Sequence, residues 1–205
     1  MLAEDVKPNR LDKSKIEIKS ILRKLKGDRV GMVAFAGSSF LQTPLSLDYS
    51  AFLLFLDAVK TGYIPDPGTS LDQAIRMALQ SFSGQENKYR ALILFTDGED
   101  HEGGLERALE EAHKVNARIY TIGVGTAEGG PIPLKDERGR KSGFKKARSG
   151  NIVVTKLNQP LLEKIAHDTG GLYLPSTPGE QEIDIILRHL ASLGQKRFKE
   201  QTVSE

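Results

Sequence analysis

Three runs of apolar residues predict buried β-strands in this chain. They cover residues 30–36, 91–95 and 119–124, and each is almost entirely apolar instead of alternating with polar residues. Such runs are typical of parallel strands, because helices cover both faces of a parallel sheet. A shorter run at residues 172–174 predicts one last strand.

Apolar residues between these runs recur at helical spacing and predict amphipathic helices. The five stripes cover residues 11–25, 71–82, 105–115, 161–165 and 183–193. The first is set among Lys, Glu and Arg residues and is followed by Gly27, a helix stop signal, so we expect an amphipathic surface helix. Strands that alternate with helices predict an α/β fold with an open, mostly parallel sheet and helices on both faces.

Length and composition narrow the number of domains and the classes of function that the chain can have. The 205 residues, 39% of them hydrophobic, suffice for one substantial core, so we expect a single domain over residues 1–205. Basic and acidic residues nearly balance, 29 against 27, which gives no general reason to expect nucleic acid as a partner. The absence of cysteine excludes disulfides and thiolate chemistry. No stretch has the length and apolarity of a membrane span or a signal peptide, so we expect these residues to be soluble.

Residues 126–157 interrupt the alternation of strands and helices. The segment is rich in glycine, and between Lys135 and Arg148 it carries seven basic residues against two acidic ones. We interpret it as an inserted hairpin or mobile loop. The basic patch raises the alternatives of contact with RNA or acidic lipid. Its single aromatic residue, Phe144, is a poor basis for stacking on bases, so a solvated loop is the preferred interpretation.

An acidic turn, Thr96-Asp97-Gly98-Glu99-Asp100, follows the second long apolar run. An Asp at the carboxyl tip of a parallel strand points toward the crevice where such sheets bind ligands. Carboxylate and hydroxyl oxygens are hard ligands suited to Mg²⁺. Asp97 is therefore a candidate metal ligand. On this residue alone, the alternative that it only caps the turn stays open.

A second loop, Pro67-Gly68-Thr69-Ser70, opens the helix expected from Leu71. The hydroxyl of Thr69 or Ser70 can cap that helix, which is the simpler interpretation. We expect this loop and the turn at Asp97 to meet on one face of the sheet. Together they are more specific than either alone and predict a binding site there.

With these two elements the sequence resembles the von Willebrand factor A domains, which carry a metal-ion-dependent adhesion site. The family's site combines an Asp-x-Ser-x-Ser loop after the first strand, a Thr in a later loop, and an Asp after the fourth strand. Thr69 matches the second part and Asp97 the third, and residues 31–35 and 122–125 match the second and fifth strands. The resemblance implies a protein-interaction module in which oxygen ligands hold Mg²⁺ and an acidic side chain of a partner completes the metal shell.

Three further segments narrow the resemblance to one branch of the family. Residues 1–10, 42–45 and 130–133 are similar to the bacterial membrane-anchored proteins associated with aerotolerance operons. Members of this branch typically carry membrane helices before and after the domain. The resemblance therefore implies an extramembrane portion of a membrane-anchored protein, with the periplasm as the expected side.

One part of the family pattern is missing. The first strand and its Asp-x-Ser-x-Ser loop are expected immediately before Met1 and do not stand in the sequence. Only Thr69 and Asp97 are carried over as ligands, since Asp5 lies too far along the loop, and we expect Mg²⁺ to bind weakly or not at all. Because that strand is central in the family, we expect the flanking strands to close up, to receive another segment, or to take a strand from a second chain and form a dimer.

An enzyme is the alternative: a Mg²⁺-dependent phosphoryl-transfer or hydrolase domain that uses Asp97 and Asp100. It would need a nucleophile or base and a phosphate-binding loop. The sequence has no Gly-x-Ser-x-Gly elbow, His-Glu-x-x-His pair, Gly-x-Gly-x-x-Gly fingerprint or Walker lysine motif. We expect His101 to be a solvated loop residue and the other three histidines to lie on the surface. The sequence therefore predicts a binding module and not an enzyme.

Overall fold

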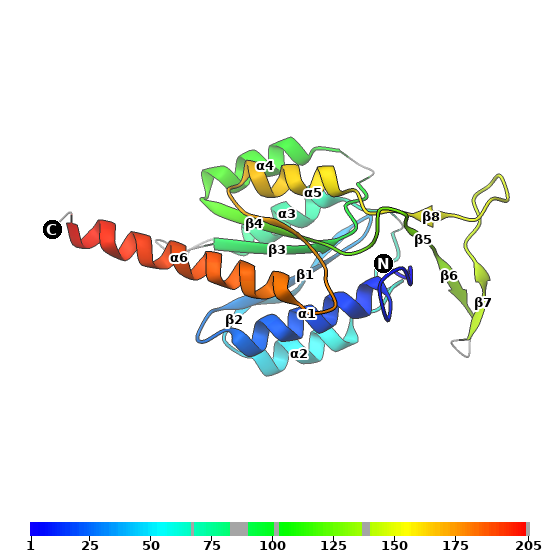
Figure 1. Ribbon diagram of the computed structural model, residues 1–205, viewed down its shortest axis with the longest axis horizontal. Helices are drawn as coiled ribbons and strands as arrows, with labels where there is room; N and C mark the ends of the chain where they lie inside the picture. The colour runs from blue at the N-terminus through cyan, green and yellow to red at the C-terminus, as the bar shows by residue number, and fades with distance from the viewer. Residues whose placement is uncertain (67, 83–89, 101–102, 137–139, 204–205) are drawn as a thin grey trace.

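The computed structural model of the chain describes residues 1–66, 68–82, 90–100, 103–136 and 140–203. Figure 1 shows its helices and strands around a central sheet. The helices are α1 (Arg10–Lys24), α2 (Tyr49–Ala58), α3 (Leu71–Gln80), α4 (Leu105–Lys114), α5 (Gln159–Asp168) and α6 (Gln181–Val203). The strands are β1 (Val30–Phe35), β2 (Ser39–Ser46), β3 (Arg90–Thr96), β4 (Ala117–Gly123), β5 (Gly130–Pro131), β6 (Pro133–Lys135), β7 (Lys141–Phe144), β8 (Val154–Thr155) and β9 (Tyr173–Pro175).

The main strands form two separate groups. Strands β3, β4 and β9 make a parallel sheet in that order, with Arg90 of β3 opposite Ala117 of β4. Strands β1 and β2 make an antiparallel pair, in which Phe35 lies opposite Ser39. The four strands expected from the apolar runs are confirmed, but β1 pairs antiparallel and is only partly buried, which differs from the parallel, buried strand that its run predicts. Strand β2 is not evident in the sequence, because its short apolar stretches are interrupted by polar residues and Pro44.

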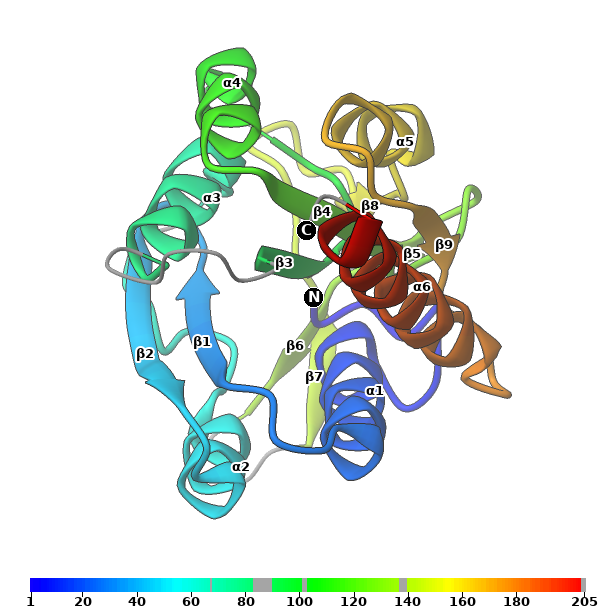
Figure 2. The ribbon, with the colours of Figure 1, turned by 90° about the vertical axis from the view of Figure 1, so that its left-hand side faces the viewer.

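Helices cover both faces of the parallel sheet, as the sequence predicts. Successive residues of a strand point to opposite faces. Ile119 of β4 therefore packs in one cluster with Leu109 of α4, whereas Tyr120 packs in another with Ile21 of α1. Figure 2 shows α3, α4 and α5 on one side of the sheet and α1, α2 and α6 on the other. The expected α/β architecture is confirmed.

A gap separates the two groups of strands. Within the described residues, β1 pairs only with β2, and β3 pairs only with β4. A cavity of about 1190 Å³ lies between β1 and β3. In Figure 2 the ribbons of β1 and β3 stand apart from each other. Of the three outcomes expected for the flanking strands, direct pairing is therefore wrong: the strands stay apart.

Helix α1 is more deeply embedded than its amphipathic pattern predicts. Its N-terminus is capped by Asn9, whose side chain accepts a hydrogen bond from the backbone N–H of Asp12. The helix contacts both α2 and α6. Arg10, Lys13 and Glu17 are buried, with exposed fractions of 0%, 7% and 0%. The expectation of a simple surface helix is wrong, because charged residues that pair inside a fold look the same in sequence as solvated ones.

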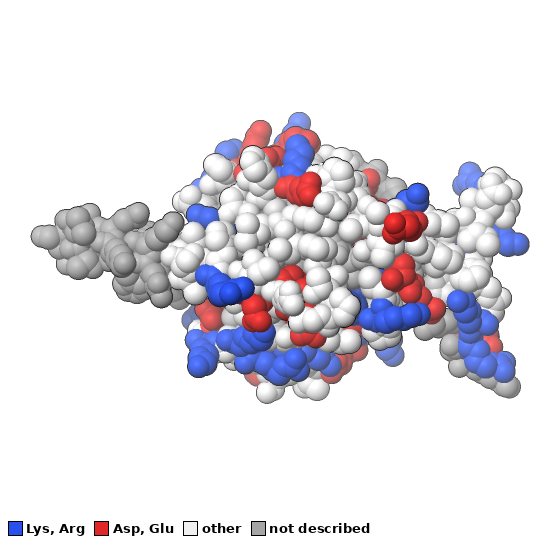
Figure 3. Space-filling view, viewed as in Figure 1, with Lys and Arg blue, Asp and Glu red and all other residues white. Residues whose placement is uncertain are grey.

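The inserted segment folds as paired strands. Strand β6 pairs antiparallel with β7, and β5 pairs antiparallel with β8. The hairpin of β6 and β7 projects from one end of the molecule (Figure 1), and basic side chains gather on this projection in Figure 3. Lys141, Lys145, Lys146 and Arg148 are exposed, while Arg138 lies outside the described residues. Among the described helices, none combines the length and apolarity that crossing a membrane requires.

Candidate functional site

Asp97 lies in the turn directly after β3 and is 6% exposed. The turn needs glycine next, because Gly98 has a φ of 76° and a Cβ there would lie 2.8 Å from the carbonyl oxygen of Asn158. The backbone N–H of Asn158 donates to the carbonyl oxygen of Asp97 at 2.7 Å. The turn is thereby tied to the start of α5, which fixes the position of the Asp97 carboxylate.

The Asp97 carboxylate already pairs with a cation, the guanidinium of Arg10. Nη1 of Arg10 donates to Oδ2 of Asp97 at 2.7 Å. Nε and Nη2 donate to the two carboxylate oxygens of Asp5 at 2.9 and 2.8 Å. The Oγ1 and carbonyl oxygen of Thr155 accept from Nη1 and Nη2 at 3.0 and 2.9 Å. One fully buried guanidinium therefore joins α1 to the tip of β3, to the N-terminal segment and to the insert.

Two charges of this cluster are maintained by their partners despite burial. Burial alone raises the pKa of Asp5, but hydrogen bonds from Arg10 and Thr126 outweigh burial and lower that pKa. Burial alone lowers the pKa of Arg10, but Asp5 and Asp97 outweigh it and raise that pKa. Arg10 and Asp5 are therefore ionised at neutral pH.

The structure places Thr69 and Asp97 at the same end of the cavity between β1 and β3. Both residues border the cavity, together with Gly68, Thr96 and Glu99. Thr69 is partly exposed in the loop before α3, whereas Asp97 is buried. This end of the cavity lies beyond the carboxyl ends of the strands, where ligands of open α/β sheets bind.

Asp100, which the sequence interpretation considered only as a residue of a possible enzyme site, caps the start of α3. Ser70 is the N-cap residue but makes no side-chain capping hydrogen bond. Oδ1 of Asp100 instead accepts from the backbone N–H of Leu71 at 3.3 Å. A carboxylate is favoured at this position by the positive end of the helix dipole. Capping by Thr69 or Ser70 is therefore wrong, and Asp100 is engaged as a helix cap.

The residues at this end do not fit a bound Mg²⁺ ion. Mg²⁺ needs near-octahedral oxygen ligands, and a guanidinium next to Asp97 repels a second cation. Thr69 and Asp97 contribute two oxygen-bearing side chains. Within the described ranges, no three His, Asp or Glu residues are grouped so that they can hold a metal. The Asp97 carboxylate instead forms an ion pair with Arg10 of the same chain.

The sequence interpretation missed Arg10 and Thr155 as members of this cluster, and it set Asp5 aside. Arg10 stands 87 residues before Asp97 and 145 residues before Thr155, so no local pattern connects them. Thr155 also lies in the segment interpreted as a solvated insert. The one local signal is the spacing of five residues between Asp5 and Arg10, which is too common to point to a site.

The histidines do not form a catalytic group with the candidate carboxylates in the described part of the chain. His101 lies outside the described residues. His113 and His167 are exposed, as expected. His189 differs from the expectation, because its Nδ1 shares a hydrogen bond of 2.9 Å with the hydroxyl of the buried Tyr120. The two rings also make a T-shaped contact, so His189 packs against Tyr120 and contributes to the fold.

Comparison with known proteins adds evidence from outside the chain. Residues 1–99 match the family described as von Willebrand factor type A domain. The solved structure of the conserved hypothetical protein BatB from Bacteroides thetaiotaomicron is 36% identical, with a TM-score of 0.89, over 95% of this chain and 93% of that chain. An aerotolerance-related membrane protein from Bacteroides fragilis NCTC 9343, solved with multiple mutations to serines, is 34% identical, with a TM-score of 0.87, over 94% and 93%.

More distant similarities extend this comparison. An uncharacterized protein of Borreliella burgdorferi is 29% identical over 171 residues, which are 80% of this chain and 47% of the relative. The chain therefore spans about half the length of that relative. Proximal thread matrix protein 1 of the mussel byssus, solved with a zinc-occupied metal-ion-dependent adhesion site, shares the fold at 18% identity and a TM-score of 0.61, over 94% of this chain and 43% of that chain.

Proposed function

Because this chain belongs to the von Willebrand factor type A domain family, in its aerotolerance-related branch, we propose that it binds a protein partner at the carboxyl end of its parallel strands. Thr69 and Asp97 mark the proposed contact surface. The family generally supplies protein-interaction modules, and this position is where ligands of such sheets bind. The proposal names a surface and leaves the partner to be identified by experiment.

One observation carries the proposal. Two loops that are far apart in the sequence, the one with Thr69 and the one with Asp97, border the same end of one cavity. Both are positioned by the fold: Ser70 donates its backbone N–H to the carbonyl oxygen of Ala36 at 2.8 Å, and Asp100 caps α3. The surface is thus preorganised, which lowers the entropic cost of binding a partner.

Metal binding has a reduced role in this proposal. In the family's mechanism an acidic side chain of the partner completes a metal shell, and the mussel protein holds zinc at that site. Thr69 and Asp97 would be the ligands from this chain. We propose that residues 1–205 alone bind Mg²⁺ weakly or not at all, because two ligands are too few and Arg10 neutralises one of them. Stronger metal binding requires oxygen ligands from outside these residues.

The proposed setting is a bacterial membrane surface. The Bacteroides fragilis relative is described as a membrane protein, which supports anchoring of the whole protein that contains this domain. We place the domain on the periplasmic side. Labelling of intact cells with a membrane-impermeant lysine reagent tests this placement, since Lys141 and Lys145 are exposed and would react only on the outer side of the inner membrane.

Pull-down from a membrane extract of the source organism tests the interaction surface. Immobilised parent domain is compared with Thr69→Val and Asp97→Asn, and retained proteins are quantified. We expect Thr69→Val to reduce the retained partner at least about tenfold, as loss of a central interface contact does. Asp97→Asn should reduce it as well, because it also weakens the contact with Arg10 that holds this end of the sheet. Asp57→Asn is the matched control, because Asp57 is an exposed carboxylate that pairs with Lys19 at the end of α2. Equal retention by all four proteins contradicts the proposed surface.

A catalytic role is not favoured by the contacts of the two carboxylates that it would use. Asp97 pairs with Arg10, and Asp100 caps α3. A general base must reach the proton that it removes. The Thr155 hydroxyl lies 3.4 Å from Oδ2 of Asp97, but it donates at the shorter distance of 2.6 Å to Glu99 and accepts from Arg10. A generic phosphatase screen checks this alternative: turnover that disappears in Asp97→Ala would favour the enzyme.

A further inference from the structure

Residues 151–155, at the end of the insert, form an extended segment that includes β8 and is paired along one edge. Val153 donates its backbone N–H to the carbonyl oxygen of Lys145 at 2.8 Å, and its own carbonyl oxygen accepts from the N–H of Ile132 at 3.4 Å. Thr155 pairs with β5. Figure 1 shows β5, β6, β7 and β8 at the end of the molecule that lies away from the C-terminus. One edge of this segment is thus occupied by the insert itself.

The opposite edge of the segment is free within the described part of the chain. The N–H and C=O groups of successive residues in an antiparallel strand alternate between its two edges. Because Val153 and Thr155 face the paired edge, Ile152 and Val154 direct their backbone groups to the other edge, where no described strand pairs with them. An edge of this kind is a template for pairing with another chain.

The outward face of the segment carries two aliphatic side chains between two lysines. Ile152 and Val154 are each 49% exposed. Lys146 lies directly opposite Ile152, and directly opposed residues of an antiparallel pair share a face. Lys156 follows two residues after Val154 and lies on the same face. Both lysines are exposed. The face is therefore an apolar pair flanked by basic side chains.

Positive charge on this part of the insert is only partly neutralised. Lys141 pairs with Glu4 at 3.7 Å. None of the ion pairs formed among the described residues involves Lys146, Arg148 or Lys156. Figure 3 shows the basic side chains gathered on this projection of the molecule. A surface with uncompensated positive charge favours an acidic partner.

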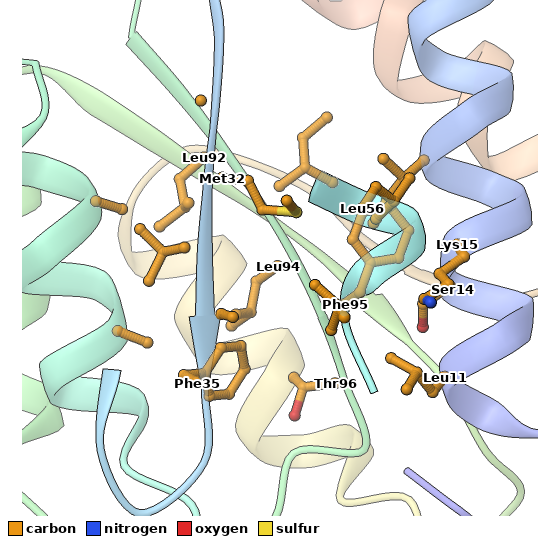
Figure 4. A pocket seen from close by; sticks show the side chains of 18 of the residues that line it. Leu11, Ser14, Lys15, Met32, Phe35, Leu56, Leu92, Leu94, Phe95 and Thr96 are labelled. Atoms are coloured by element: carbon orange, nitrogen blue, oxygen red, sulfur yellow. The ribbon is translucent and has the colours of Figure 1, made fainter. Parts of the chain in front are cut away.

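The inner face of the segment is turned toward the body of the molecule. Ile132 and Val153 border the cavity between β1 and β3. The same cavity is lined by Leu94 and Phe95 of β3 (Figure 4). A partner therefore meets the outward face and the free edge, where Ile152 is exposed.

Thr155 ties the segment to the proposed partner surface. Its carbonyl oxygen accepts from Nη2 of the buried Arg10 at 2.9 Å, and its hydroxyl donates to Glu99 at 2.6 Å. Arg10 also holds Asp97. The free edge is thereby fixed beside the carboxyl end of the parallel strands, and a preorganised edge lowers the entropic cost of adding a further strand.

An acidic protein segment fits this surface better than lipid, RNA or a second copy of the chain. A bilayer and an RNA provide anionic groups, but neither provides a row of peptide N–H and C=O groups for a strand edge. Single-stranded RNA is also recognised by stacking on aromatic side chains, and Phe144 is only partly exposed. A second copy would bring the same lysines together, which is unfavourable.

We propose that the free edge of residues 152–154 binds an extended, acidic segment of the protein partner, which adds to the insert as a β-strand. The backbone of that segment pairs with Ile152 and Val154, and its apolar side chains pack on the same two residues. Acidic side chains on either side of the apolar ones meet Lys146 and Lys156. The inference deepens the proposed function by giving the chemistry of the partner, and it rests on that function for the premise that the partner is a protein.

A short synthetic peptide tests the free edge. The probe is Ser-Glu-Thr-Val-Thr-Ile-Thr-Glu-Ser with an N-terminal fluorescein and a C-terminal amide, so that Glu, Val, Ile and Glu share one face of the extended peptide. Binding to residues 1–205 is measured by fluorescence anisotropy. The control peptide carries N-methyl groups on the backbone nitrogens of Val and Ile, which removes two donors and leaves the side chains unchanged. We expect the control to bind at least about tenfold more weakly.

Charge reversal in the protein provides the second comparison. The double variant Lys146→Glu/Lys156→Glu should bind the probe at least about tenfold more weakly than the parent, because like charges then face each other. Lys114→Glu is the matched control, since Lys114 is an exposed lysine at the end of α4, and it should bind like the parent. The three proteins should melt at the same temperature, because all three lysines are exposed.

Absence of peptide binding, or equal binding by the parent and the double variant, would overturn the inference. So would binding of phosphatidylglycerol vesicles or of a uridine oligonucleotide that the double variant loses while the peptide does not bind, since lipid or RNA would then be the ligand. A dimer of the parent in sedimentation that the double variant abolishes would identify a second copy as the occupant instead.

The pull-down from membrane extract separates this inference from the proposed function. Retention that falls with Thr69→Val but not with Lys146→Glu/Lys156→Glu contradicts the free edge and leaves the surface at Thr69 supported. Retention that falls with the double variant but not with Thr69→Val supports the free edge and contradicts the surface at Thr69. We expect both variants to reduce retention.

Discussion

The guanidinium of Arg10 lies 2.7 Å from Oδ2 of Asp97, so the carboxylate that the family pattern assigns as a metal ligand pairs with a cation of the chain itself. Arg10 is fully buried and also pairs with Asp5. The two carboxylates and the guanidinium stabilise one another, because a buried charge that loses a close counter-ion is unfavourable. The contact between Arg10 and Asp97 therefore affects both metal binding at Asp97 and the stability of the carboxyl end of the sheet.

Residues 1–205 are predicted to show no saturable Mg²⁺ binding at millimolar concentration. The physical reason is the ligand count, two side chains where Mg²⁺ needs a near-octahedral shell, together with repulsion by Arg10. Titration calorimetry measures this directly. Tight, saturable binding would show that other residues complete a site, and the variants Asp5→Asn and Asp100→Asn would then identify them.

Arg10→Met is predicted to destabilise the fold by roughly 3–5 kcal/mol, since it leaves Asp5 and Asp97 without their shared cation. Denaturant unfolding of the parent and variant provides the measurement. Lys24→Met is the matched control, because Lys24 pairs with Asp184 on the surface and should contribute about 0–1 kcal/mol. Similar losses for the two variants would refute a special role for Arg10.

Glu17 is predicted to make stability depend on pH. Burial raises its pKa from 4.5 to about 7, despite hydrogen bonds from Ser176 and Lys13 that lower it. Because the folded pKa is the higher one, the favourable contribution is complete below pH 4.5 and is lost as pH rises through 7. Glu17→Gln should therefore match the parent near pH 4.5 and exceed it at pH 8, by up to roughly 3 kcal/mol.

Denaturant unfolding of the parent and of Glu17→Gln at pH 4.5 and pH 8 measures this difference in stability. Glu110→Gln serves as the control, because Glu110 is exposed on α4. The assignment fails when Glu17→Gln and Glu110→Gln shift stability equally at pH 8, since burial would then have no effect on the Glu17 carboxyl.

The sequence predicts most of the main helices and strands of this fold. Residues 91–95 and 119–124 are apolar on both faces, a pattern that suits a strand covered by helices on both sides. Strand β2 escapes prediction because it is an antiparallel edge strand with polar residues and a proline. Apolar periodicity reports burial on a helix or strand, and it is weakest where burial is partial.

The candidate site is less accessible to sequence reasoning. Thr69 and Asp97 are found through short motifs, and the structure places both at one end of the cavity. Arg10 and Thr155 are not found, because their contacts to Asp97 depend on how α1 and the insert pack.

Photo-crosslinking from position 66 tests the central claim, a partner surface at the carboxyl end of the sheet. A benzoylphenylalanine is placed at position 66, exposed in the loop of Thr69, or at position 54, where Leu54 is 74% exposed on α2. Both proteins are incubated with membrane extract of the source organism and irradiated, and the products are identified by mass spectrometry. The account predicts one dominant adduct from position 66 that weakens when Thr69→Val is added, and no such adduct from position 54. Equal labelling from both positions, or labelling from position 66 that is indifferent to Thr69, would contradict it.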